Sequence, residues 1–572
     1  GLSWQDALPS LQDALTLARR SQHAFIDQVM GTGASTFNTL GNALATWNGG
    51  GFTPTQEEDI RTKARALIGQ IWVAEGTYYP HDGTGLPLTG ADASFDLLEQ
   101  LAIYGGFRGR QDTSGAGYED RLDQRRSDPL VGGTVLSGAK PGATPSQHVV
   151  AAGARAAPND SFGVLFEQVD RTAILDGFVI EGGVANASSV PTGLHPNTQS
   201  TGGGICLIDA SPTLRNLVVR GNEAAGGGGV FVWGEGSSPL LEDCTITDND
   251  AYSGGGIAFR VTNSTLQLPE APVLRRCRIL GNRAQPLTYD AQGQSTSGDG
   301  GGVSWIGFPG QTTTRSPGHL LLDRCRIADN TAGTGAGVHI SQDGTAELQS
   351  CEIVGNVTVT QDANGNVTLG GFGGAGLEVS LTRPRCLVVQ CLIADNRGQS
   401  SGGLGTTSYL NDGPELVVRN STIASNDINA GSSAVSLNQT GGSWLFENCI
   451  ITGGQALGGV ALSPPLRSLG SAGTLRYCLF DETPEVPNFV ANSIGNIVDS
   501  PGFEDEAHRN FRLSGSSPAV DAGNQFVDFD PWTPGFQGPP ATDIDGNTRI
   551  ADGGVGPSNP PAIDLGAYER QP

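Results

Sequence analysis

Three kinds of residue are scarce in this chain of 572 residues: Lys63 and Lys140 are its two lysines, methionine occurs once, and aromatic residues make up 6%. Lysine plus arginine numbers 33 against 58 for aspartate plus glutamate, which gives a formal net charge of −25. Because an acidic chain without a basic run repels phosphate, we expect no nucleic-acid partner. The apolar runs are also shorter than the roughly 18 residues that cross a bilayer, so we expect no membrane span.

Glycine is the most prominent residue, with 85 copies beside 33 prolines. Each glycine inside a helix costs about 0.5 to 1 kcal/mol relative to alanine, which argues against a helical bundle. The glycines cluster in threes without the strict period of collagen. Apolar residues still make up 37% of the chain and fall in short runs, so we expect a buried core rather than disorder.

A block of sequence recurs from about residue 202. It reads GGGICLIDASPTLRNLVVRGN over 202–222 and GGGVFVWGEGSSPLLEDCTITDN over 227–249. Further copies begin at Gly254, Gly300, Gly335, Gly374 and Gly402. A repeat of about 25 residues suits three short strands. Since one such unit cannot bury its own apolar face, successive coils must stack. The sequence therefore predicts an all-β fold, a right-handed parallel β-helix.

Seven of the nine cysteines fall at one repeat position. They are Cys244, Cys277, Cys325, Cys351, Cys391, Cys449 and Cys478. A disulfide framework would distribute cysteines between different loops, and a metal site would need paired cysteines or histidines in register. We therefore predict a stacked structural ladder of buried thiols.

An asparagine closes most copies of the repeat. The column comprises Asn222, Asn249, Asn282, Asn330, Asn356, Asn396 and Asn426. Asparagine tolerates left-handed backbone angles and can hydrogen-bond the turn of the neighbouring coil, so we predict a second structural ladder. The glycine triplets would allow positive φ and close approach of adjacent coils.

The Gly-Gly-Ile/Val and Ile-x-x-Asn signatures resemble the repeats of secreted bacterial right-handed parallel β-helix proteins and of the polymorphic outer-membrane protein families. The opening GLSWQDALPSLQDAL and the stretches at 71–80 and 103–109 resemble the start of the same secreted group. The end, FRLSGSSPAVDAGN at 511–524 and IDLGAYE at 563–569, is similar to a choice-of-anchor type C-terminal module. This resemblance implies an extracellular or cell-surface bacterial protein.

Three regions follow from these patterns: a helical N-terminal cap and insert region at 1–70, the β-helix at 71–510 and an irregular C-terminal module at 511–572. In the first, Leu8, Leu11, Leu15 and Ala18 recur at helical spacing and predict a helix that caps the first coil. Two further helices are expected, around 37–47 and 55–68. Because the chain starts at Gly1 without a preceding strand, we expect a processed form whose first strand another molecule could supply.

The repeats differ in length because of inserts. Those at 184–201, 284–299 and 357–372 all follow the asparagine turn and precede the glycine run. They should protrude from one edge of the solenoid, where repeat proteins often bind partners.

No catalytic residues can be assigned from the sequence. Asp248, Asp329 and Asp395 share one column, but Gly281 and Gly355 replace them in the coils between. The aspartates then lie about 9.6 Å apart, at the outer limit for an inverting pair of carboxylates, and a turn role is favoured. The seven histidines have no metalloprotease or triad spacing.

A calcium site is a weaker prediction. Asp543, Asp545 and Asn547 in DIDGN resemble the start of an oxygen-rich calcium loop, but Gly554 stands where the bidentate glutamate is expected. A plain Asp-Gly turn is favoured, and we expect no cofactor other than calcium.

We therefore predict an extracellular structural or adhesive surface protein that self-associates, end to end into a filament or sheath, or binds other matrix components. The alternative is a polysaccharide lyase, a glycoside hydrolase or a glycan-binding module acting on an extracellular polysaccharide. A groove lined by several acidic and aromatic residues in adjacent coils would favour the enzyme, whereas a flat Thr/Ser surface would favour the scaffold or adhesin.

Overall fold

The computed structural model describes residues 8, 10–19, 68–82, 90–109, 119–153, 169–185, 200–234, 237–261, 271–289, 295–307, 319–408, 412–428, 433–454, 464–469, 473–487, 489, 493–526, 541–549 and 563–570. The chain divides into two compact units, Gly1–Asp250 and Ala251–Pro572, which we call the N-terminal unit and the C-terminal unit.

The N-terminal unit contains four parallel sheets, A to D. Sheet A consists of β1 (Gln70–Ala74), β4 (Ala102–Phe107), β7 (Ile174–Asp176), β11 (Thr213–Arg215) and β15 (Leu240–Glu242). Sheet B consists of β2 (Gly76–Tyr78), β5 (Thr134–Ser137), β8 (Val179–Glu181), β12 (Val218–Arg220) and β16 (Thr245–Thr247). Sheet C consists of β3 (Phe95–Asp96), β6 (Val150–Gly153), β10 (Ile205–Ile208) and β14 (Val230–Trp233). Sheet D contains β9 (Val184–Ala185) and β13 (Glu223–Gly226).

The C-terminal unit repeats this order. Its sheet A consists of β19 (Val273–Arg275), β25 (His319–Asp323), β29 (Thr345–Gln349), β34 (Arg385–Val389), β38 (Glu415–Arg419), β42 (Ser443–Glu447) and β45 (Gly473–Arg476). Sheet B consists of β20 (Arg278–Leu280), β26 (Arg326–Ala328), β30 (Glu352–Val354), β35 (Leu392–Ala394), β39 (Thr422–Ala424), β43 (Ile450–Ile451), β46 (Leu479–Phe480) and β47 (Ile497–Val498).

Sheet C of this unit consists of β18 (Ile257–Val261), β24 (Val303–Gly307), β28 (Val338–Ser341), β33 (Leu377–Ser380), β37 (Ser401–Ser408), β41 (Ser433–Gln439) and β44 (Leu466–Ser468). Sheet D contains β21 (Arg283–Ala284), β27 (Thr331–Ala332), β31 (Val357–Gln361), β36 (Arg397–Gly398) and β40 (Asp427–Ile428). β17 (Asp250–Ser253) begins at the last residue of the N-terminal unit.

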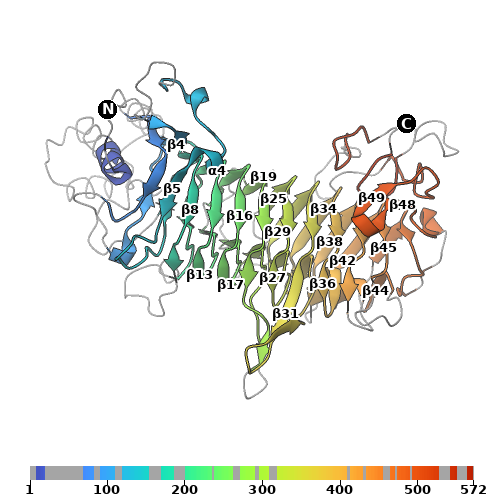
Figure 1. The fold of residues 1–572 in the computed structure, drawn as a ribbon. Helices are drawn as coiled ribbons and strands as arrows, with labels where there is room; N and C mark the ends of the chain where they lie inside the picture. Colours follow the sequence, from blue (N-terminus) through green and yellow to red (C-terminus); the bar gives the residue numbers. More distant parts are fainter. Residues whose placement is uncertain are drawn as a thin grey trace, which may run out of the picture. The chain divides into compact units, whose positions relative to one another are not determined.

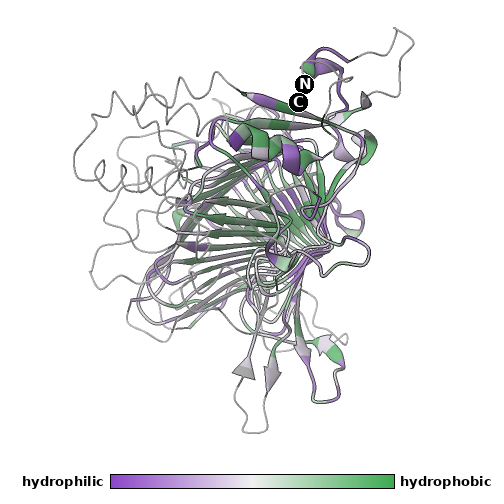
Figure 2. Cartoon of the chain, turned by 90° about the vertical axis from the view of Figure 1, so that its left-hand side faces the viewer, coloured by the Kyte–Doolittle hydropathy of each residue, from purple (hydrophilic) through white to green (hydrophobic). Residues whose placement is uncertain are grey.

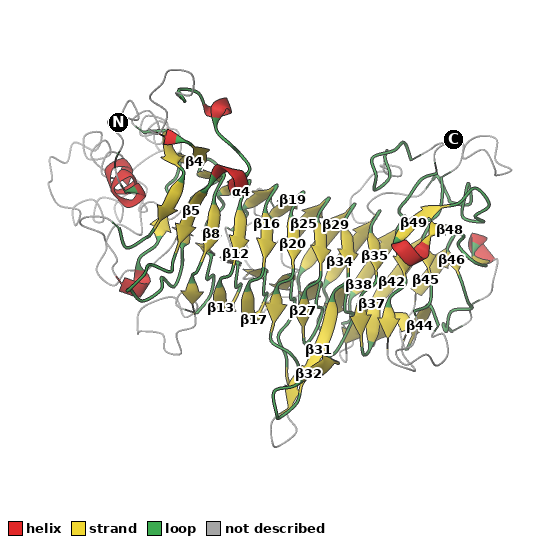
Figure 3. Ribbon diagram, viewed as in Figure 1, coloured by secondary structure: helices red, strands yellow, loops and turns green. Residues whose placement is uncertain are grey.

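Within sheets A to D the strands pair in parallel with their counterparts one coil away, as β29 does with β25 and β34 (Figure 1). Strands dominate both units and the helices are few and short (Figure 3). Because parallel strands joined by crossovers take the right-handed course, each unit is a right-handed parallel β-helix, and the predicted fold class is confirmed. No helix among the described residues is long and apolar enough to cross a membrane.

Apolar columns form the core between the sheets. In sheet C of the C-terminal unit the column consists of Ile257, Val303, Val338, Leu377, Leu404, Val435 and Leu466, each fully buried. Figure 2 shows the green of apolar residues concentrated along the strands. At roughly 25 cal/mol per Å² of buried apolar surface, this shared interior supplies the main driving force for stacking the coils.

The glycine triplets serve two different needs. The first glycine has a left-handed backbone, with φ of 66° at Gly254 and 65° at Gly300. The third is required by space, since a Cβ at Gly376 would lie 2.6 Å from the carbonyl oxygen of Gly403 and 2.9 Å from Nδ2 of Asn396. A Cβ at Gly302 or Gly337 would likewise meet a glycine carbonyl oxygen and an asparagine Nδ2 of a neighbouring coil. The glycine corner and the asparagine column therefore interlock.

A helix at 11–19 packs on the first coil of the N-terminal unit. It buries Leu11, Leu15 and Ala18, and Gln12 donates hydrogen bonds from Nε2 to the carbonyl oxygens of Pro80 and Ser94 at 3.0 and 2.7 Å. Leu8, which the pattern placed in the same stripe, precedes the helix and is 43% exposed. The two further helices expected around 37–47 and 55–68 lie outside the described residues. This unit also has η2 (Gly90–Asp92), η4 (Leu122–Gln124) and α4 (Pro129–Gly132).

Two of the predicted inserts form adjacent hairpins on the sheet D side. One pairs β22 (Thr288–Tyr289) with β23 (Ser295–Thr296), and the other pairs β31 with β32 (Val367–Leu369). The backbone N–H of Leu287 donates to Val359, and that of Gln361 donates back to Leu287, at 2.9 and 2.8 Å. These two inserts therefore leave from one edge, as predicted. The insert at 184–201 lies almost wholly outside the described residues.

The residues after β47 fold back onto sheet B of the C-terminal unit. β48 (Phe503–Asp505) and β49 (Asn510–Leu513) form a hairpin joined by η6 (Glu506–His508), and η5 (Ser493–Gly495) precedes them. Phe511, Ala567 and Tyr568 pack against Val354, Leu392, Ala394 and Ala424. Part of the outward face of sheet B is thus covered by these C-terminal residues.

Candidate functional site

The cysteine column lies directly before the strands of sheet B. All nine cysteines are described and buried, and none forms a disulfide. Cys351 and Cys391 each donate from Sγ to a carbonyl oxygen of the preceding coil, Leu322 and Leu348 respectively, at 3.3 Å. Burial raises the pKa of the Cys351 thiol. A protonated, packed thiol is neither a nucleophile nor a thiolate ligand, so this geometry is that of a packing column.

The asparagine column forms a chain of side-chain hydrogen bonds in the C-terminal unit. Asn282 donates to Asn330, Asn330 to Asn356, Asn356 to Asn396 and Asn396 to Asn426, each from Nδ2 to Oδ1 at 2.9 to 3.1 Å. Asn222 and Asn249 make the same contact in the N-terminal unit at 3.0 Å. These side chains also satisfy backbone groups of the preceding coil, as Nδ2 of Asn356 does for the carbonyl oxygen of Ile327, so the column closes the turns between sheets B and D.

The aspartate column occupies a left-handed turn position. Asp248, Asp329 and Asp395 have φ of 55°, 57° and 55°, and Gly281 and Gly355 have φ of 62° and 70° at the equivalent positions. Aspartate and glycine alternate there because both tolerate this backbone conformation. The column is set by turn geometry and does not form a carboxylate pair within one coil.

The predicted calcium ligands form a tight turn. Asp543 accepts hydrogen bonds from the backbone N–H groups of Asn547 and Glu569 at 2.7 and 2.9 Å. Asp545 accepts a bidentate pair from Arg512, both at 2.8 Å. Among the described residues no group of three or more His, Cys, Asp or Glu side chains is placed to hold a metal ion. Calcium binding at Asp543, Asp545 and Asn547 stays a prediction.

A cluster of polar side chains that the sequence reading missed lies on the second face of sheet C in the C-terminal unit. Alternate strand residues point away from the core, and here they form two columns that we call the sheet C polar patch. It consists of Ser304, His339 and Glu378 in the first column and Ser341, Ser380 and Thr407 in the second. All but Thr407 are less than 9% exposed. Buried polar groups in consecutive coils are unusual and require partners.

His339 lies at the centre of the sheet C polar patch. Its Nε2 atom is 2.9 Å from Oγ of Ser380, and its Nδ1 atom is 3.9 Å from Oδ2 of Asp299. Nδ1 is buried without a hydrogen-bond partner. Burial lowers the pKa of His339, with Arg260 acting in the same direction and Asp299 against it. The imidazole is therefore neutral near pH 7 and available as a base.

Hydrogen bonds hold two ionisable side chains close to His339. Arg260 donates to the hydroxyls of Ser304 and Ser253 at 3.1 and 2.9 Å, and burial lowers its pKa to about 10. Glu378 accepts the backbone N–H of Gly374 at 2.7 Å, and burial raises its pKa to about 7. A Cβ at Gly405 would lie within 2.3 Å of Oε2 of Glu378, so the glycine there leaves room for the carboxyl.

A usable signal for the polar patch was present in the sequence. Ser304, His339 and Glu378 each stand two residues after the last glycine of a Gly-Gly-Gly or Gly-Ala-Gly triplet, at Gly302, Gly337 and Gly376. Alignment of the repeats on these glycines places the three side chains in one column. Spacing along the chain, by which the histidines were judged, could not reveal a cluster built across coils.

No family model and no curated protein matches the chain. Among solved structures, the crystal structure of pectate lyase Pel9A is similar, with 12% sequence identity and a TM-score of 0.38. The match covers 89% of this chain and 90% of that chain.

Proposed function

We propose that this β-helix is an extracellular protein that binds a polysaccharide of low negative charge at the sheet C polar patch. The observation that carries the proposal is the repetition of hydroxyl, imidazole and carboxyl groups at two positions in consecutive coils. Extracellular location is part of the same proposal and rests on the resemblance of the repeats.

Hydrogen-bonding chemistry supports a sugar ligand. Hydroxyl groups of sugars both donate and accept, and the polar patch offers donors and acceptors of both kinds on a parallel array. Rows spaced by about 4.8 Å along the coils suit an extended polymer that contacts one coil after another. Thr407 and Arg260 are partly exposed at the margin of the polar patch, so this part of it is accessible from solvent.

The charge of the chain restricts the polysaccharide class. A net charge of −25 repels polyanions at moderate ionic strength. A neutral or esterified polysaccharide avoids this repulsion, and the proposal is restricted to such polymers.

Affinity electrophoresis in gels containing neutral, acetylated or polyuronic polysaccharides tests the proposal. Thr407→Trp, which adds bulk at the margin of the polar patch, should weaken binding by tenfold or more. Arg278→Trp is the matched control, because Arg278 is an exposed strand residue of sheet B. The proposal is contradicted if no neutral or acetylated polymer retards the wild type and Arg278→Trp. It is also contradicted if such a polymer retards Thr407→Trp and Arg278→Trp equally.

The structural or adhesive function, with self-association end to end, stays a separate prediction. Electron microscopy and light scattering of the purified protein, with and without calcium, test it. Ordered polymers would support the filament hypothesis, and dispersed monomers under all conditions would oppose it.

A further inference from the structure

Ser380 and His339 form a hydroxyl–imidazole pair across two neighbouring strands. β28 and β33 pair in register with Ser341 opposite Ser380 and His339 opposite Glu378, so the Ser380–His339 contact runs diagonally. The Oγ to Nε2 distance of 2.9 Å is that of a good hydrogen bond. Both side chains are buried, at 6% and 3% exposure, so the pair is fixed by packing.

The second nitrogen of the imidazole faces a carboxylate. Oδ2 of Asp299 lies 3.9 Å from Nδ1, and the Asp299 side chain is 30% exposed. A carboxylate on this side favours the tautomer with the proton on Nδ1, which leaves Nε2 free to accept the Ser380 proton. Movement of less than 1 Å would convert the 3.9 Å approach to a hydrogen bond, and such contacts commonly tighten when a substrate binds.

We propose that Ser380 is the nucleophile and His339 the general base of an ester hydrolase that acts on acyl groups of the bound polysaccharide, with Asp299 as a positioning residue. The inference rests on the proposed polysaccharide binding for its substrate class. A serine activated by a base performs acyl transfer, whereas glycosidic bonds are cleaved between two flanking carboxyl groups. An ester is also uncharged, in keeping with the acidic chain.

The reaction balances without a further reagent. Oγ of Ser380 attacks the ester carbonyl carbon while its proton passes to Nε2 of His339. The bond from carbonyl carbon to sugar oxygen then breaks, and the sugar oxygen takes the proton back from Nε2. Water attacks the acyl-serine in the second half, with His339 again accepting and returning a proton. The products are one carboxylic acid and one free sugar hydroxyl.

Labelling of the folded, full-length protein with a fluorophosphonate probe tests the nucleophile directly. We expect mass spectrometry to find the label on Ser380, and we expect His339→Asn to label about 100-fold more slowly. Ser443→Ala is the matched control, because Ser443 is an exposed residue of β42 in sheet A and lies outside the polar patch. No label in the wild type, or label on another residue, would overturn the assignment.

The pH profile separates positioning by Asp299 from a merely structural role. Because Asp299 raises the pKa of His339, Asp299→Asn should shift the rise of the labelling rate to lower pH. A lower rate with an unchanged profile would overturn the positioning role. A second variant is available if Ser380→Ala, used below, fails to fold. Ser380→Cys keeps a nucleophile of similar shape, and its thiol can be alkylated. Peptide mapping must then show that Cys386 and the other buried thiols are not the alkylated residues.

Release of acetate from an acetylated polysaccharide completes the test. Ser380→Ala should keep polysaccharide binding and lose acetate release. Labelling of Ser380 without polysaccharide binding would support Ser380 as the nucleophile and overturn the proposed function. Polysaccharide binding without labelling or acetate release would support the proposed function and overturn the assignment of Ser380.

Discussion

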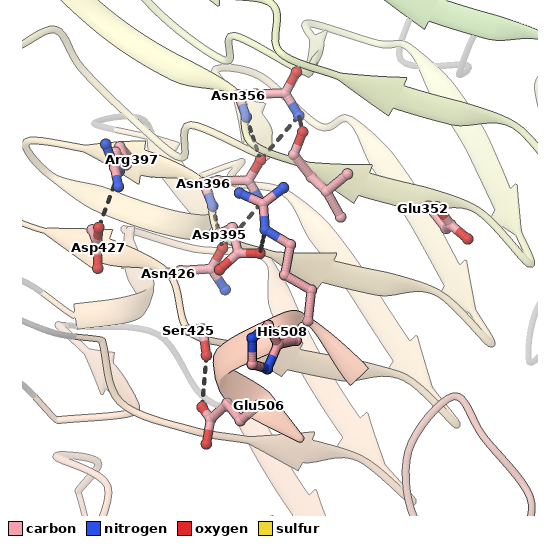
Figure 4. A network of polar contacts seen from close by, with 12 residues as sticks. Glu352, Asn356, Asp395, Asn396, Arg397, Ser425, Asn426, Asp427, Glu506 and His508 are labelled. Atoms are coloured by element: carbon pink, nitrogen blue, oxygen red, sulfur yellow. Dashed lines mark hydrogen bonds and ion pairs between the residues drawn. The ribbon is translucent and has the colours of Figure 1, made fainter. Parts of the chain in front are cut away.

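Arg509 forms an ion pair with Asp395, with 2.8 Å between Nε and Oδ2. Arg509 is the C-cap residue after η6, and Asp395 lies in the turn after β35. Close by, Oγ of Ser425 donates to Oε1 of Glu506 at 2.6 Å (Figure 4). These polar contacts, with Phe511 packed on sheet B, hold the returning end of the chain against the coils of the C-terminal unit.

Replacement of Asp395 tests how far this ion pair compensates for burial. Burial raises the pKa of Asp395 despite the opposing effect of Arg509, so the folded state binds the proton more tightly than the unfolded state. The group therefore lowers stability once it is ionised, and this effect disappears as the pH falls below both pKa values. Asp395→Asn, which suits the φ of 55°, should melt higher than wild type at pH 7 and equally at pH 3.

The control for this experiment is Asp329→Asn. Asp329 has the same left-handed backbone, with φ of 57°, and lies two coils before Asp395. Its variant measures the effect of the same substitution at another turn of the column. A lower melting temperature of Asp395→Asn at pH 7 would mean that the Arg509 pair outweighs the cost of burial.

Removal of one asparagine rung should destabilise the fold strongly. Asn396 donates from Nδ2 to Ile353 and Asn426 and accepts from Asn356 at Oδ1, all at 2.9 to 3.0 Å. Asn396→Ala leaves these buried groups unpaired, which should cost about 3 kcal/mol in the free energy of unfolding. Urea denaturation measures it, and Asn438→Ala, at an exposed position of β41, should stay within about 0.5 kcal/mol of wild type. Equal stability of the two variants would show that the hydrogen bonds of the asparagine column do not stabilise the fold.

The carboxyl of Glu378 should make the fold less stable at neutral pH than at pH 4. Its pKa of about 7 in the fold exceeds the ordinary 4.5, so stability falls as the pH rises between these values and the loss is complete above 7. A difference of about 2.5 between the two pKa values corresponds to about 3 kcal/mol in the free energy of unfolding. Glu378→Gln should therefore unfold at higher denaturant concentration than wild type at pH 8.5 and at a similar concentration at pH 4.

The matched control is Glu482→Gln, because Glu482 is exposed. It should leave the denaturation midpoint unchanged at both pH values. A Glu378→Gln variant that is less stable at pH 8.5 would indicate that the ionised carboxylate is well paired in the fold.

The fold could be read from the sequence because its determinants repeat. Glycine, cysteine and asparagine recur at fixed positions, and each coil packs between two similar coils. Equivalent residues such as Asn356 and Asn396 therefore have the same environment. The polar patch is confined to a few consecutive coils and is not part of the repeat itself. Ala258 and Gly405 occupy the column of His339 and Glu378, so the site depends on which coil carries which side chain, and Asp299 enters from an insert outside the repeat.

The end of the chain was also beyond the repeat pattern. Phe511 and Tyr568 lie far apart in sequence and meet on sheet B, and the small residues Ala394 and Ala424 provide the flat surface that receives them. Small outward residues on one sheet are a signal of a covered face. They do not identify the covering segment, because contact between distant segments depends on the path of the whole chain.

The thiols of the cysteine column should be inert in the folded protein. All nine cysteines are buried, and burial raises the pKa of Cys325, Cys351 and Cys478, which removes the reactive thiolate. Reaction with a chromogenic disulfide at pH 8 should therefore release no rapid colour from the native protein and the equivalent of nine thiols after denaturation. Asn438→Cys, at an exposed position of β41, should add one fast thiol and serves as the positive control. Rapid reaction of the native wild type would show that the coils open locally, and peptide mapping of the modified cysteine would identify the coil that opens.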